Sequence, residues 1–179
     1  MLDATKSAEP TLFYLPYERF LEELEAVALA IEADPWQPDF LVGIGRGGLV
    51  PAAYLSHRTG IQMLSVDHSS GEVGFGDELL DKLAAKIRAG SRILIVDDIN
   101  DSGGTIQFLR AAIAAKSDDP AGLRVAVLVH NIRSRARAEY RGSEIDRDSD
   151  KRWYVFPWEA VAPRATLKIE ALAVPERLA

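Results

Sequence analysis

Two adjacent carboxylates, followed by a run of small polar residues, form the part of this sequence best suited to chemistry. Asp97 and Asp98 come directly after the apolar run Ile93–Val96, and the small polar run follows shortly after them. Consecutive backbone amides at the start of a helix bind phosphate well, because they have no partner within the helix and the helix dipole is positive there. The glycines of the run let an anion approach the backbone closely. We therefore expect a phosphate site formed by Asp101, Ser102, Gly103, Gly104 and Thr105.

The carboxylates of Asp97 and Asp98 need a different partner, because they would repel a phosphate. The apolar run before them predicts a buried parallel strand, which would place both side chains at the carboxyl end of a sheet, where α/β proteins bind ligands. Vicinal sugar hydroxyls and Mg²⁺ both suit carboxylate oxygens. A phosphate next to a diol describes a ribose 5-phosphate. The structural alternative is a strand followed by an acidic N-cap, and the segment lacks the Gly-Lys-Ser/Thr ending of a Walker A loop.

A glycine-rich segment, Gly45–Pro51, follows a second apolar run, Phe40–Ile44. Three glycines in four residues after a strand indicate a sharp bend or a close approach to a ligand. The guanidinium of Arg46 within this segment can present a planar fork to phosphate oxygens. The structural alternative is an ordinary turn between a strand and a helix.

The segment Trp153–Glu159 is short, rich in aromatic residues and ends in an acid. An indole ring stacks well on the face of a purine, so this segment is a candidate wall of a base-binding site. A strand at the edge of the core is the structural alternative.

Together these segments resemble the type I phosphoribosyltransferases, and most closely the xanthine-guanine and hypoxanthine-guanine enzymes. The resemblance covers about residues 38–160 and includes three motifs in the family's order. It implies Mg²⁺-dependent transfer of the 5-phosphoribosyl group from phosphoribosyl pyrophosphate (PRPP) to a purine base in purine salvage. The base would be hypoxanthine, guanine or xanthine, and the products would be the nucleoside monophosphate and pyrophosphate. A phosphoribosyltransferase for another base and a non-catalytic PRPP-binding regulator are the alternatives.

The resemblance also implies a role for each site residue. Asp97 and Asp98 would hold the ribose hydroxyls and would contact Mg²⁺ together with Glu159, Asp98 being the stronger metal candidate. Asp101 would face the base as a general acid and base. The other roles fall on Arg46 and Gly47 for pyrophosphate, and on His130, Trp153 and Tyr154 for the base.

One departure from the family concerns the base. Relatives place a lysine at the end of the strand before the basic segment, where it contacts the 6-oxo group, whereas this sequence has His130. A neutral histidine can donate one hydrogen bond, so the role could be kept or lost, and the preferred base stays open. The family also suggests a cis peptide bond between Gly45 and Arg46.

Composition narrows the class of protein. The chain has 179 residues, enough for one domain (1–179, with 1–10 as a tail), and its net charge of −6 argues against binding nucleic acid through the whole surface. It has no cysteine, which excludes disulfides and thiolate metal sites. No apolar run approaches the roughly 20 residues of a membrane helix. We expect a cytoplasmic protein. The resemblance implies that it forms a homo-oligomer, either a dimer or a tetramer.

These elements predict an α/β fold with a mostly parallel central sheet of about five strands, flanked by helices, and a small hood formed by residues 1–38 and 150–179. Hydrophobic periodicity predicts helices over 17–33, 51–60, 77–89 and 104–116, and strands over 40–44, 62–67, 92–96 and 125–129. The residues rich in Gly and Ser over 67–76 predict a loop, and the resemblance implies that this loop closes over the reacting centre. Residues 130–150 are expected to be a polar loop, and 163–179 are undecided between strand and helix.

Overall fold

A parallel β-sheet forms the centre of the computed structural model, which describes residues 9–66, 75–117 and 119–174. The sheet has five strands in the order β3-β2-β4-β5-β6, and all neighbours are parallel. This confirms the predicted α/β fold and its five-stranded sheet. The strands are β2 (Phe40–Ile44), β3 (Gln62–Val66), β4 (Ile93–Asn100), β5 (Leu123–Asn131) and β6 (Tyr140–Ile145).

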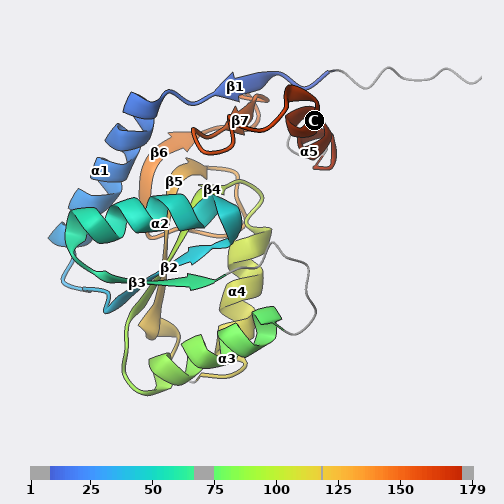
Figure 1. The fold of residues 1–179 in the computed structure, drawn as a ribbon. Helices are drawn as coiled ribbons and strands as arrows, with labels where there is room; N and C mark the ends of the chain where they lie inside the picture. Colours follow the sequence, from blue (N-terminus) through green and yellow to red (C-terminus); the bar gives the residue numbers. More distant parts are fainter. Residues whose placement is uncertain (1–8, 67–74, 118, 175–179) are drawn as a thin grey trace, which may run out of the picture.

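Helices cover both faces of this sheet (Figure 1). Helices α1 (Tyr17–Ala33) and α2 (Gly45–Thr59) pack on one face, and α3 (Phe75–Arg88) and α4 (Gly104–Ala114) pack on the other. Side chains of β4 alternate between the two hydrophobic clusters, as expected for a strand buried on both faces. The central strand is therefore held from both sides, so its carboxyl end is a rigid place for a site.

The two ends of the chain meet in a hood at one end of the sheet (Figure 1). Strand β1 (Leu12–Tyr14) pairs in parallel with β7 (Trp153–Val155), and helix α5 (Arg164–Leu172) follows. The hood is smaller than predicted, because α1 packs on the sheet, where its apolar stripe is buried against the core. The sequence left residues 163–179 undecided between strand and helix, and helix α5 shows that 164–172 are helical.

The strand order places a topological switch point between β2 and β4. From β2 the chain passes through α2 to β3 on one side, and from β4 it passes through α4 to β5 on the other side. Helices α2 and α4 therefore start at neighbouring strand ends and run to opposite sides. Open α/β sheets bind their ligands in the crevice at such a point. The glycine-rich segment and the carboxylate segment of the sequence meet at this point.

Two strand predictions need correction. Strand β4 continues to Asn100, four residues beyond the predicted end, because its backbone remains paired with β5 after the apolar run stops. Strand β6 lies within the segment predicted as a polar loop. Only the residues at its two ends, Tyr140 and Ile145, are buried, so this edge strand carries no apolar run that periodicity could detect.

The helix predicted over 51–60 begins earlier, at Gly45, so the glycine-rich segment is itself helical. The peptide bond between Gly45 and Arg46 is trans, so the expected cis bond is wrong. Gly45 instead makes the turn from β2 into α2 with a φ of 56°, a left-handed conformation that favours glycine. A side chain here would be strained, and Gly45 is therefore the residue that lets α2 begin directly at the strand end.

The next glycines let α2 approach the end of β4 closely. A Cβ atom on Gly47 would lie 2.4 Å from Oδ2 of Asp98, and one on Gly48 would lie 2.1 Å from the carbonyl oxygen of Val96. Both distances are too short for a real side chain. Glycine is therefore needed at these two positions so that α2 can pack closely against the end of β4, where the candidate site lies.

Some predictions fall outside the described residues. They include the closing loop, of which residues 67–74 are not described, and residues 1–8 of the predicted tail. Among the helices that the structure describes, none is both long and apolar enough to cross a lipid bilayer.

Candidate active site

The paired carboxylates lie at the carboxyl end of β4, between β5 and the start of α2. Both side chains are partly buried. The amide of Asp98 donates to Oδ1 of Asp97 at 3.1 Å, and the amide of Ile99 donates to Oδ1 of Asp98 at 2.6 Å. Because Oδ2 of Asp98 faces the backbone of Gly47, the carboxylate of Asp98 lies directly beside the glycine-rich turn.

The predicted phosphate site lies at the start of α4. Gly103, with a φ of 87°, precedes the helix, and a Cβ there would be 2.6 Å from the amide nitrogen of Ala136. Ser102, Gly104 and Thr105 are exposed. The N-cap residue, Gly103, makes no side-chain cap, and the amide of Gly104 makes only a long bond, 3.4 Å, to Oγ of Ser102. The first amides of a helix have no partner within it, so this turn offers donors and a positive dipole to an anion. The geometry suits the phosphate role predicted for these residues.

Asp101, the predicted general acid and base, is buried and paired with Arg147. Nε of Arg147 donates to Oδ1 and Oδ2 of Asp101 at 3.0 and 3.2 Å, and Nη2 donates to Oδ2 at 2.7 Å. Nη1 donates to the carbonyl oxygens of Asp150 and Arg152 at 3.0 and 2.6 Å. The Asp101 and Arg147 side chains are 3% and 9% exposed, so solvent screens this ion pair very little.

Asn131, at the end of β5, extends this buried network. Its Nδ2 donates to the carbonyl oxygen of Asp101 at 3.1 Å, and its Oδ1 accepts from the amides of Arg133 and Arg147. The network therefore joins the β4–α4 turn, the end of β5 and the segment that leads to β7. Each of these segments is held in place by the other two.

His130 lies beside this network but has different partners. Its Nδ1 is 3.0 Å from Nδ2 of Asn100, which also donates to the carbonyl oxygen of Ala136, while Oδ1 of Asn100 accepts from Ser134. These bonds orient the Asn100 amide, so Nδ1 of His130 accepts and the ring proton is on Nε2. Burial lowers the pKa of His130, and the nearby charge of Arg141 lowers it further. The ring is therefore neutral. Its contact with a base stays a prediction.

A cavity opens between the carboxyl end of β4 and the hood. Tyr154 points away from solvent: its hydroxyl donates to Oδ2 of Asp150 at 2.9 Å, and its ring meets Phe13 edge to face. Trp153 is only partly buried and is available as a wall for a flat ligand. The side chain of Tyr154 thus supports the hood, and its backbone is left for contacts with a ligand. The cavity is lined by Asp98, Ile99, Arg147, Trp153, Tyr154, Phe156 and Glu159.

Glu159 faces the same cavity as Asp98. Its Oε2 accepts from the amide of Phe156 at 2.9 Å. Burial raises the pKa of Glu159 to about 7, and the negative charge of Asp98 contributes to the rise. A divalent cation beside these two carboxylates would offset their repulsion, so the pair fits the predicted Mg²⁺ contact. No group of three or more acidic, histidine or cysteine side chains in the described part of the chain forms a complete metal site. Substrate oxygens and water would have to supply the other ligands.

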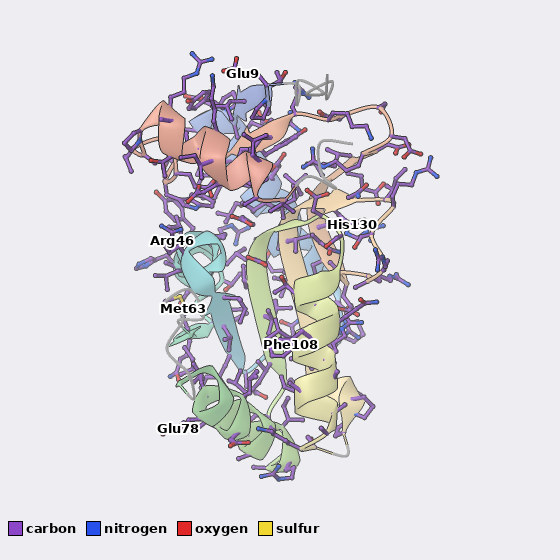
Figure 2. The ribbon with its side chains drawn as sticks, turned by 90° about the vertical axis from the view of Figure 1, so that its right-hand side faces the viewer. Glu9, Arg46, Met63, Glu78, Phe108 and His130 are labelled. Atoms are coloured by element: carbon purple, nitrogen blue, oxygen red, sulfur yellow. The ribbon has the colours of Figure 1, made fainter. Side chains whose placement is uncertain are left out.

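Arg46, predicted to bind pyrophosphate, lies at the start of α2. Figure 2 labels Arg46 and His130 at the same end of the sheet. The Arg46 side chain is 82% exposed, and its Nη2 is 3.6 Å from Oε1 of Glu170 on α5. An exposed pair at this distance contributes little stability, so Arg46 can exchange Glu170 for an anionic ligand at small cost.

Comparison with known proteins agrees with this geometry. A family model described as "Phosphoribosyl transferase domain" matches residues 14–162. This chain belongs to that family. The resemblance inferred from the three motifs is thereby confirmed.

Individual relatives are more distant. Over 123 residues the chain is 32% identical to the xanthine-guanine phosphoribosyltransferase of Gluconobacter oxydans, covering 66% of this chain and 67% of the relative. Over 116 residues it is 28% identical to the adenine phosphoribosyltransferase of Gluconacetobacter diazotrophicus, covering 59% of this chain and 65% of the relative. The matches thus span about two thirds of each relative, and the two relatives act on different purines.

Solved structures show the same fold. The Helicobacter pylori xanthine-guanine-hypoxanthine phosphoribosyltransferase aligns with a TM-score of 0.62 at 22% identity, covering 82% of this chain and 92% of that one. A Neisseria gonorrhoeae hypothetical protein with bound ppGpp aligns with a TM-score of 0.64 at 21% identity, covering 93% and 97%. At these identities the likeness establishes the phosphoribosyltransferase fold.

Arg147 is the site residue that sequence reasoning missed. It lies in the polar segment 130–150, where it looks like one arginine among several. Four other arginines of this segment, at positions 133, 135, 137 and 141, are exposed. The pairing with Asp101 joins residues 46 positions apart. One signal in the sequence could have led to Arg147. The lysine of the phosphoribosyltransferase pattern is replaced by His130, so another residue could be expected to supply the positive charge.

The raised pKa of Glu159 predicts a pH-dependent stability. The folded protein holds this proton up to about pH 7, whereas the unfolded chain loses it near the usual value of 4.5. The folded state therefore binds more protons between these values, and its free energy of unfolding should fall as pH rises from about 5 to 7, by about 3 kcal/mol from this group alone. Urea denaturation without divalent cations measures the slope.

The control for this prediction is Glu159→Gln, which removes the titrating group and keeps an oxygen for the Phe156 amide. The variant should lose that part of the pH dependence and should be more stable than the wild type at pH 8. An unchanged slope would show that other groups cause the effect.

Proposed function

We propose that this protein transfers the 5-phosphoribosyl group of PRPP to a 6-oxopurine (hypoxanthine, guanine or xanthine) and releases pyrophosphate. One observation carries the proposal. Adjacent carboxylates, a helix start with a glycine as its N-cap residue and a cavity walled by Trp153 converge at the carboxyl end of β4. These three features match the diol, the phosphate and the base of the expected product. Family membership supports the reaction class, and the xanthine-guanine relative supports the base.

PRPP would bind across the two helix starts. The amides and hydroxyls of Ser102–Thr105 would hold the 5′-phosphate, where the α4 dipole favours negative charge. Asp97 and Asp98 would accept hydrogen bonds from the ribose hydroxyls. Arg46 and the backbone of Gly47 would take the pyrophosphate at the start of α2. Bound in this way, PRPP would bring C1′ of the ribose next to the cavity that contains Trp153.

The chemical step exchanges one bond at C1′ for another. The C1′–oxygen bond to pyrophosphate breaks with its electron pair, and a ring nitrogen of the base forms a bond to C1′. The ribose becomes positively charged in the transition state, and nearby carboxylates stabilise that charge. Asp101 would take the proton released by the base as the new bond forms. This role requires the base to come within hydrogen-bonding reach of the Asp101 carboxylate, which Arg147 binds here and which does not itself line the cavity.

The residues present fit a magnesium ion in this reaction. Asp98 and Glu159 would hold it, with Asp97 nearby, because their negative charges face one cavity or adjoin it. When bound, the ion would offset the charge of the departing pyrophosphate. The residues of the chain would still orient the base and the sugar by themselves.

The test is nucleotide formation from PRPP and Mg²⁺ with a panel of hypoxanthine, guanine, xanthine, adenine, uracil and orotate. We expect turnover with at least one 6-oxopurine and loss of turnover in Asp98→Asn. Turnover with adenine alone or with a pyrimidine alone would show that this base, and not a 6-oxopurine, is the substrate. Tight PRPP binding by calorimetry without turnover would favour the alternative of a PRPP-binding regulator.

Trp153→Ala is expected to raise the KM for the base by about 5- to 100-fold, because stacking one base on an aromatic ring contributes about 1–3 kcal/mol. PRPP affinity should stay nearly unchanged, since the tryptophan lies in the hood and away from the phosphate turn. Steady-state kinetics with each substrate varied in turn separates the two constants. A collapse of PRPP binding would show that Trp153 is structural.

Assembly and location belong to the same proposal. Several apolar side chains of α1 and α2 are exposed, which supports a homo-oligomer, a dimer or tetramer, and equilibrium sedimentation would measure it. These side chains are Tyr17, Leu21, Leu29, Leu49 and Tyr54. A cytoplasmic location fits PRPP, a highly charged intracellular metabolite.

A further inference from the structure

Arg147 lines the cavity that contains Trp153, and most of its hydrogen-bonding capacity is already used. An arginine carries five N–H donors in a rigid fork. Nε uses its single N–H on Asp101, Nη1 uses both of its own on the carbonyls of Asp150 and Arg152, and Nη2 uses one on Asp101. Four of the five are accounted for (one, two and one), which leaves one N–H on Nη2.

We propose that Arg147, in place of His130, donates a hydrogen bond to an oxo group of the base and thereby selects oxopurines over adenine. The inference rests on the proposed function and deepens it, because it names the residue that reads the base and the chemistry that it recognises.

The direction of the donor is set by the other contacts of Arg147. The carboxylate of Asp101 holds one edge of the guanidinium, and the two carbonyl oxygens hold the Nη1 corner. The plane cannot rotate without breaking several of these bonds. The remaining Nη2 donor is therefore preorganised, so binding a base costs little side-chain entropy.

Chemical complementarity then decides the base. A carbonyl oxygen accepts from a guanidinium, and the positive charge strengthens the bond. The exocyclic amino group of adenine is a donor, so it would face another donor and leave both unpaired. Sites built around a hydrogen bond reject analogues that lack the partner group. A guanidinium remains charged at any physiological pH, so this preference needs no titration.

His130 is poorly placed for the same task. Its ring is buried beside Asn100, and His130 is absent from the residues that line the cavity in the part of the chain that the structure describes. Its Nδ1 accepts from Asn100, so only Nε2 could donate to a base. The cation that relatives place at the end of β5 is thus supplied here from the segment between β6 and β7.

The test compares bases in wild type and Arg147→Lys. The lysine keeps the positive charge but lacks the planar, forked set of N–H donors of the guanidinium. The wild type should prefer hypoxanthine over adenine in kcat/KM, and the variant should reduce that ratio by about 10- to 100-fold, the size of one hydrogen bond to a charged group. The reduction should come from the hypoxanthine value, with the KM for PRPP within about twofold of wild type. Arg133→Lys is the matched control, because Arg133 also pairs with carboxylates but is exposed.

Two outcomes would overturn the inference: an unchanged ratio, including an equal loss for both bases together with weaker PRPP binding, or a wild-type preference for adenine. If the wild type turns over no base, the proposed function fails. Calorimetry then tests Arg147 separately, since Arg147→Lys should weaken binding of inosine monophosphate and spare adenosine monophosphate.

A second measurement needs no variant and covers the case in which Arg147→Lys does not fold. Wild-type protein should bind inosine monophosphate about 10- to 100-fold more tightly than purine ribonucleoside monophosphate, which lacks the oxo group. Equal affinities would show that no donor in the cavity reads that group.

Discussion

Asp101→Asn is expected to lower turnover by about 10²- to 10⁴-fold, the range that general acid–base catalysis contributes. Asparagine keeps an oxygen that can accept from Arg147 but cannot take a proton from the base. The affinity for PRPP should change far less, because in the proposed site Ser102–Thr105 and the paired carboxylates of β4 would supply the PRPP contacts. Turnover measured at saturating substrates and PRPP affinity measured by calorimetry give the two values.

Asp119→Asn is a matched control, because Asp119 is exposed and lies at the opposite end of α4, where it caps a short turn. It should leave turnover unchanged. Equal losses of turnover and of PRPP affinity in Asp101→Asn would remove the assigned catalytic role. Circular dichroism at the assay temperature shows that the variant is folded.

Arg147→Met should lower the free energy of unfolding by about 3–5 kcal/mol, because it leaves the buried carboxylate of Asp101 without its counter-charge. It also removes the donors to the carbonyl oxygens of Asp150 and Arg152, which hold the segment before β7. Urea denaturation at pH 7 measures the loss.

The double variant Asp101→Asn/Arg147→Met tests whether this loss comes from the pair. With the carboxylate gone, removing Arg147 should cost less than it does alone, so the two effects should not add. Arg133→Met is the control, because its exposed ion pairs should contribute under about 1 kcal/mol. Additive losses would show that Asp101 and Arg147 stabilise the fold independently.

The glycine-rich segment shows how local patterns succeed and fail. The three glycines correctly indicated a close approach, but the approach is to β4 itself, as Gly47 faces Asp98 and Gly48 faces Val96. A sequence pattern reports that a side chain is excluded and does not report what excludes it. The structure identifies the neighbour and also shows that the segment is helical.

The sequence by itself determined the core and the chemistry at the end of β4. Apolar runs marked β2 and the buried part of β4, and a 3.6-residue period marked α1, because burial leaves a local record in residue order. The carboxylates and small residues of the β4–α4 turn are contiguous, so a short window of sequence was enough to predict a ligand site there. These features were predictable without a model.

Only the tertiary structure decided the partners of that turn. The pairing of Asp101 with Arg147, the bond between Asn100 and His130, and the pairing of β1 with β7 join residues far apart in sequence. Such contacts depend on how strands are ordered and how segments cross the sheet, and no single window of sequence records them. The guanidinium of Arg147 beside the proposed base site therefore became visible only when the fold brought the β6–β7 segment to the end of β4.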